Sequence, residues 1–162
     1  MSKRRSRPSR YESGVFTDHH IPILQALVDG LQTIEEIAQK LDRKTGRIDH
    51  LRGEITSTFA DRGVGKDNTA KAVVYAVVHN LVNFDVIDRI RPKRRSNDRE
   101  INVLTAMFFG LDNRQIAAHL SKREEEIKAC KQDILDNLGV ISPYTALAWG
   151  VRRSLQRLKQ GG

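Results

Sequence analysis

Polar and basic residues gather within ten positions in the first third of the chain, and their types are those that bind nucleic-acid bases and phosphates. They are Arg43, Lys44, Thr45, Arg47, His50 and Arg52. The apolar residues among them, Ile48, Leu51 and Ile55, have the spacing of one buried helix face. An arginine guanidinium can pair with two acceptors on guanine, so an exposed helix face of this kind is suited to reading base edges. Asp49 is an acid among them, and a carboxylate can accept a hydrogen bond from cytosine.

A second stretch, 79 residues further on, offers a weaker version of the same chemistry. Its basic residues are Lys122, Arg123, Lys128 and Lys131. Residues 124–126 are three successive glutamates, which phosphates would repel. Carboxylates at a helix start also favour the helix dipole, so they have an ordinary structural explanation. We therefore expect the two stretches to differ in their affinity for DNA.

The excess of positive charge lies in two short segments. The 162 residues carry a formal charge of +8, and the sequence pI is about 9.9. Residues 1–14, which include Arg4 and Arg5, form a basic tail that we expect to be disordered, and residues 88–96, which include Lys93, Arg94 and Arg95, form a basic linker. Such segments can clamp phosphates or enter a minor groove, and the simpler alternative is that they are only solvated.

Other chemistry has little support in the sequence. The five histidines are scattered, apart from the adjacent His19 and His20, so no metal site is expected. Cys130 is the single cysteine and has no neighbouring base, so a small buried residue is a better interpretation than a nucleophile. No phosphate-binding glycine loop is present, and neither an enzyme activity nor a cofactor is expected. No signal peptide or membrane span is visible, which favours a cytoplasmic protein with no membrane partner.

The two halves of the chain repeat one pattern of apolar and glycine positions. Leu24, Leu27, Gly30 and Leu31 precede Leu104, Met107, Gly110 and Leu111 by 80 residues. Ile37, Ala38, Leu41, Ile48 and Ile55 precede their counterparts Ile116, Ala117, Leu120, Ile127 and Ile134 by 79. Gly63, Val64, Thr69, Ala70 and Ala72 precede Gly139, Val140, Thr145, Ala146 and Ala148 by 76. An ordered series with short gaps indicates an internal duplication.

The pattern predicts four helices in each copy, and capping residues mark their starts. In the second copy the starts are Asn97 with Glu100, Asp112 with Gln115, Ser121 with Glu124, and Ser142 followed by Pro143. In the first copy they are Thr33 with Glu36 for the second helix, Asp42 for the third, and Asp67 or Asn68 for the fourth. Pro22 and Gly53 fit less well inside helices, and residues 86–90 are ambiguous. The sequence predicts an all-α fold with two tandem four-helix helix-turn-helix modules, over residues 15–87 and 97–162, joined by the basic linker.

Within each copy, a short helix, a tight turn and a longer helix have helix-turn-helix spacing. They span residues 33–58 in the first copy and 113–138 in the second. In that motif the second helix enters the major groove with its N-terminal residues on the bases. The basic stretch around Arg47 lies at that position in the first copy.

The second copy resembles the DNA-binding domain of LuxR, FixJ and GerE type transcription regulators. The resemblance covers residues 97 to about 155 and is carried by the segments 99–104, 110–117, 127–128 and 138–140 and by Thr145-Ala146. It implies that Lys128 and Lys131 face DNA, that Asn113 and Arg114 touch the backbone, and that the fourth helix offers a dimer surface. The sequence departs from the family pattern at Glu126 and Cys130, and the first copy is a more distant match.

The fourth helix of the second copy carries a stripe at helical spacing. Its members are Ala146, Trp149, Gly150 and Arg153. Core packing is the simpler interpretation. The alternative is an interface with the other copy or with a second chain in a homodimer.

These features favour a sequence-specific transcription regulator that binds double-stranded DNA at the bacterial nucleoid. The alternative is an interaction protein whose degenerate modules bind RNA polymerase or another regulator and have only nonspecific DNA affinity. A third, weaker hypothesis is a resemblance to the promoter-reading final region of sigma factors.

Overall fold

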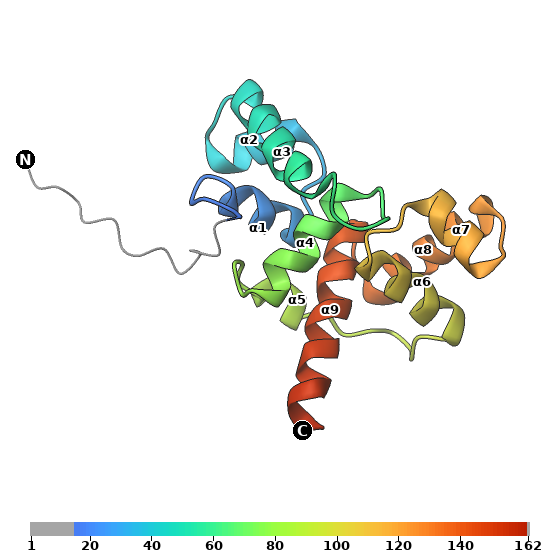
Figure 1. Cartoon of the computed structure of the whole chain (residues 1–162). Helices are drawn as coiled ribbons and strands as arrows, with labels where there is room; N and C mark the ends of the chain where they lie inside the picture. The colour runs from blue at the N-terminus through green and yellow to red at the C-terminus, as the bar shows by residue number, and fades with distance from the viewer. Residues whose placement is uncertain (1–14, 162) are drawn as a thin grey trace, which may run out of the picture.

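The computed structural model describes residues 15–161, and within this range the chain is helical with no strand (Figure 1). The helices of the first half are α1 (Ile21–Asp29), α2 (Ile34–Leu41), α3 (Thr45–Phe59) and α4 (Asn68–Val78), and a single turn, α5 (Asp85–Asp88), follows. Those of the second half are α6 (Asp98–Phe108), α7 (Asn113–Leu120), α8 (Glu124–Leu138) and α9 (Pro143–Gln160). The all-α prediction is confirmed. The basic tail with Arg4 and Arg5 lies outside the described residues.

Most of the expected helix starts are present. Thr33 caps α2, Asp67 caps α4, and Ser142 caps α9, where Pro143 is the first helical residue. Asn97 with Glu100 and Asp112 with Gln115 form complete capping boxes. Pro22 is the second residue of α1, where it removes no helical hydrogen bond, so it fits the helix.

The prediction that Asp42 and Ser121 cap α3 and α8 is wrong. Both residues instead end the preceding helix in the left-handed conformation, with φ of 51° and 54°. The next amides, of Arg43 and Lys122, donate back to the carbonyls of Ala38 and Ala117 at 2.9 Å in both turns. Helices α3 and α8 then begin after Lys44 and Arg123 without a side-chain cap. The two turns therefore share one geometry, and each joins an eight-residue helix to a fifteen-residue helix.

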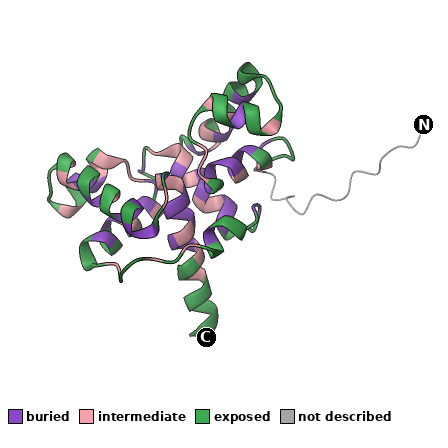
Figure 2. Ribbon diagram, turned by 180° about the vertical axis from the view of Figure 1, so that it is seen from behind, coloured by how far each residue is buried: buried purple, intermediate pink, exposed green. Residues whose placement is uncertain are grey.

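The halves meet through α4 and α9, which lie side by side at the centre of the molecule (Figure 1). At the N-terminal ends of these helices the Tyr144 hydroxyl donates to Asp67 at 3.3 Å. Further along, Arg152 of α9 lies 3.5 Å from the Asp88 carboxylate and covers the Phe84 ring. Buried apolar residues of both halves form one continuous core, and Figure 2 shows the buried residues concentrated around this contact. The halves are thus parts of one packed body.

A loop of the first half also binds the second half directly. The side chain of Gln115 in α7 accepts from the Lys66 amide at 2.9 Å and donates to the Val64 carbonyl at 2.7 Å. Nearby, a Cβ on Gly65 would lie 2.5 Å from the Gly110 backbone, so only glycine allows this approach. The two halves are therefore held by polar as well as apolar contacts.

The stripe on α9 faces its own half. Gly150 lies against Leu104 and Phe108 of α6, and Ala146 lines a small cavity with Met107. Trp149 is half-buried, and the guanidinium of Arg153 lies 5.2 Å from its ring. For Ala146 and Gly150 the core interpretation is correct.

Candidate nucleic-acid interface

The start of α3 carries a group of exposed basic residues. Arg43 and Lys44 lie in the turn before the helix, Thr45 is its first residue, and Arg47 follows within the first turn; all four are exposed. Within residues 15–161, Arg43, Lys44 and Arg47 form no ion pair. The buried residues Ile48, Leu51 and Ile55 fix the opposite face of α3 in the core. The local fold therefore aims unpaired cations away from the protein.

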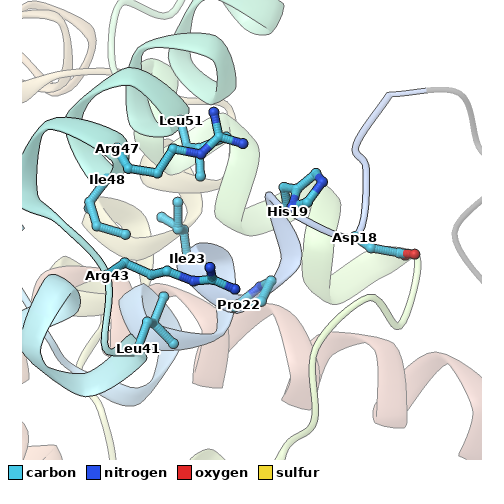
Figure 3. Close-up of a pocket in the computed structure, with 9 residues that line it drawn as sticks. All are labelled: Asp18, His19, Pro22, Ile23, Leu41, Arg43, Arg47, Ile48 and Leu51. Atoms are coloured by element: carbon cyan, nitrogen blue, oxygen red, sulfur yellow. The ribbon is translucent and has the colours of Figure 1, made fainter.

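Arg43 and Arg47 flank a small hollow of about 200 Å³ between α1, α2 and α3. Figure 3 shows both side chains extending in the same direction, with Ile23 between them and Pro22 beside Arg43. His19 and Asp18 lie at the other edge. Two guanidinium groups on either side of a hollow can contact an anionic partner at two points.

His50 is already engaged within the protein. Its Nε2 lies 2.7 Å from Glu54 Oε1, and the other oxygen of Glu54 lies 2.7 Å from Nε2 of His20. The Thr17 amide donates to His20 Nδ1, so Nε2 of His20 carries the proton that it donates to Glu54. The hydrogen bond from His20 is the main cause that lowers the pKa of Glu54. We therefore leave His50 out of the candidate contact surface. Arg52 is only half-exposed.

The corresponding start of α8 is neutralised by its own acids. Arg123 lies 3.5 Å from Glu126, and Lys128 lies 3.9 Å from Glu124. Lys122 is exposed and forms no ion pair among the described residues. The two fifteen-residue helices thus begin after turns of one geometry and differ in charge at their starts, which is positive in α3 and balanced in α8.

The remaining residues of the second half differ in their exposure. Arg114 is exposed near the start of α7, and Asn113 beside it is half-buried, with its Oδ1 unpaired. Lys131 is half-buried among Met107, Ile134 and Pro143, and burial lowers the pKa of its amine. Lys131 is therefore poorly placed to contact a phosphate.

The basic linker is bound to the second half at Lys93 and Arg94. The Lys93 amide donates to the Asn137 carbonyl, and the Asn137 side chain accepts from the Arg94 amide and donates to the Arg94 carbonyl. The Arg94 guanidinium makes two hydrogen bonds to Glu100, at 2.6 and 2.9 Å. Lys93 and Arg95 remain exposed. Asn137 lies at the C-terminal end of α8, about 20 Å from the helix start, so the linker does not extend the α8 face.

Sequence reasoning missed the polar residues that hold these segments. Gln115 was recognised only as a capping residue, and Asn137, Glu54 and the pairing of Glu100 with Arg94 were not identified. Asn137 is 4% exposed and Glu100 is 3% exposed. Their partners lie far away in the sequence or in an irregular segment, so no periodic pattern marks them.

Other types of site find no support in the described residues. No group of three or more metal-ligating side chains occurs in this part of the chain. Cys130 is buried, and burial raises the pKa of its thiol, as expected for a packing residue. None of the helices of residues 15–161 is long and apolar enough to cross a membrane.

Comparisons with known proteins leave the family open. No protein-family model matches the chain, and no curated protein or solved structure matches it. The relation to LuxR-type domains therefore remains a resemblance in sequence.

Proposed function

We propose that the chain is a sequence-specific DNA-binding transcription regulator in which α2, its turn and α3 act as a helix-turn-helix. The observation that carries this proposal is the set of exposed cations at the start of α3, Arg43, Lys44 and Arg47, which lack ion-pair partners in the described part of the chain. In a helix-turn-helix this end of the second helix meets the base edges. Arg47 lies inside α3 and is assigned to base reading, and Arg43 and Lys44 in the turn are assigned to phosphates.

The second half has a different role in this proposal. Ion pairs occupy Arg123 and Lys128, so α8 contributes little to base reading. Its packing against the first half through α4 and α9 supports a role in orienting α3. At the start of α8, Glu125 is exposed and forms no ion pair among the described residues, and it would suit a contact with RNA polymerase or another regulator, which is the alternative function for the whole chain.

Selection of bound duplexes from a random pool, followed by affinity measurement against salt, tests the proposal. The wild-type chain is expected to enrich one motif. Arg47→Ala is expected to relax the base preference at one position of the motif, with a loss of about 1 to 3 kcal/mol of discrimination between bases. Arg43→Ala is expected to weaken binding to all DNA sequences alike. It is also expected to reduce by about 1 the slope of the logarithm of affinity against the logarithm of salt concentration.

Lys128→Ala is the matched control, because this residue occupies the corresponding helix in the second half, and it should change neither the motif nor the slope. Steeply salt-dependent binding without any enriched motif would reject base reading and favour the interaction protein. A motif that changes with Lys128 and not with Arg47 would assign reading to α8 instead.

A further inference from the structure

A groove of about 410 Å³ lies between α6 and α9, on the second half of the molecule. Its apolar lining is formed by Ile101, Leu104 and Phe108 of α6, Ile134 of α8 and Trp149 of α9. The linker crosses one end with Arg95 and Ser96. The groove is separate from the α3 surface and takes no part in the proposed DNA contact.

Arginines line the groove without acidic partners. Arg153 and Arg157 follow Trp149 at four-residue intervals on α9, and Arg95 extends from the linker. All three are exposed and form no ion pair within residues 15–161. Arg94 is held by Glu100, so the buried carboxylate at the groove is already neutralised. The lining therefore combines an apolar floor with uncompensated positive charge.

Two residues beside the groove correspond to core residues of the first half. Offsets of 76 and 80 residues align Arg153 with Val77 of α4, and Ser96 with Phe16. These two counterparts are 0% and 4% exposed. The sequence repeat therefore has buried apolar residues in one half where the other has an arginine and a serine beside an open groove.

The walls of the groove meet at Gly150. A Cβ on Gly150 would lie 2.6 Å from Leu104, so α6 and α9 touch at this point. The volume falls within the range of about 300 to 1,000 Å³ that is typical of small-molecule sites.

We propose that this groove binds an amphipathic organic carboxylate, with its hydrocarbon or aromatic body on the floor of the groove and its carboxylate between Arg153, Arg157 and Arg95. An apolar body releases water from Leu104, Phe108 and Trp149. A carboxylate pairs with guanidinium groups through two parallel hydrogen bonds. A small polar anion would leave the floor unused, and an apolar cation would be repelled by the arginines.

Trp149 is the only tryptophan of the chain and lines the groove, so its emission can report binding. The full chain is titrated with dodecanoate below its micelle concentration, and acetate, dodecanol and dodecylammonium serve as comparisons. Dodecanoate is expected to give a saturable change in Trp149 emission, and calorimetry is expected to give one site per chain. Dodecanoate should bind at least tenfold more tightly than acetate, dodecanol or dodecylammonium. Binding of dodecanol or dodecylammonium as tight as that of dodecanoate would contradict the role of the arginines.

Variants separate this site from the DNA surface. The double variant Arg153→Gln with Arg157→Gln should bind dodecanoate at least tenfold more weakly, as measured by calorimetry. Thr105→Phe, at an exposed position of the groove wall, should block dodecanoate binding. Arg43→Gln with Arg47→Gln removes the same charge elsewhere and should leave dodecanoate binding unchanged while DNA binding falls. Unchanged dodecanoate binding in the Arg153/Arg157 variant, or an acidic amphipathic peptide that binds where dodecanoate does not, overturns the proposal.

Discussion

At the scale of single residues, Glu100 shows how one buried carboxylate fixes an irregular segment. Its side chain is 3% exposed, receives two hydrogen bonds from Arg94, and accepts from the Asn97 amide at 3.0 Å. Glu100→Gln retains an acceptor for the Asn97 amide and loses the charge that faces Arg94. We expect the free energy of unfolding to fall by about 1 to 3 kcal/mol, measured by urea titration.

Glu36→Gln is the matched control, because Glu36 accepts a hydrogen bond from the Gln32 amide at an exposed helix start. This substitution should lower the free energy of unfolding by less than about 1 kcal/mol. The pH dependence gives an independent check. The hydrogen bonds from Arg94 are the main cause that lowers the pKa of Glu100. This stabilisation is present above the unfolded pKa of about 4.3 and is lost as the pH falls through the lower folded pKa. The wild type should thus lose more stability on acidification than Glu100→Gln, and equal losses would contradict this role.

At the scale of elements, the sequence predicted the helices whose starts and stripes are local. Asn97 with Glu100 and Asp112 with Gln115 mark α6 and α7 because a capping box needs only residues three apart. The helix α5 has four residues and no side-chain cap, so it left no such signal. Asp42 and Ser121 were misassigned because both residue types favour N-caps, whereas both residues here end the preceding helix in the left-handed conformation.

The left-handed turn between α7 and α8 leads to a stability prediction. Ser121 has φ of 54°, a conformation that costs a residue with a Cβ about 1 kcal/mol or more. Ser121→Gly should raise the free energy of unfolding by about 0.5 kcal/mol, after the greater freedom of glycine in the unfolded chain is subtracted. Gly139 has φ of 66° with open space at its Cβ position, so Gly139→Ala should lower stability by about 1 kcal/mol. Thermal and urea unfolding measure the stability of both variants. A lower free energy of unfolding in Ser121→Gly would show that the serine stabilises the turn.

At the scale of the whole molecule, the sequence repeat could be recognised from the sequence, and the packing of the two halves could not. The repeat offsets require only the order of residues along the chain. The contact between α4 and α9, the bridge from Gln115 to Val64, and the docked linker all join residues that are far apart in sequence. The basic segment of residues 88–96 was predicted to be a linker that contacts phosphates or is only solvated, and its attachment to the second half depends on Asn137 and Glu100, which no charge pattern reveals.

One continuous core across the two halves predicts a single cooperative unfolding transition. Ile37 in α2 and Ile116 in α7 are corresponding residues of the sequence repeat, and both are 0% exposed. Replacing either with valine should cost about 1 kcal/mol. Trp149 reports only on the second half, whereas far-ultraviolet circular dichroism reports on all helices. If the halves unfold together, Ile37→Val lowers the urea midpoint of Trp149 emission as much as Ile116→Val does, and the emission and dichroism curves coincide. If Ile37→Val leaves the Trp149 midpoint unchanged while the dichroism curve splits, the halves are independent domains and the core does not couple them.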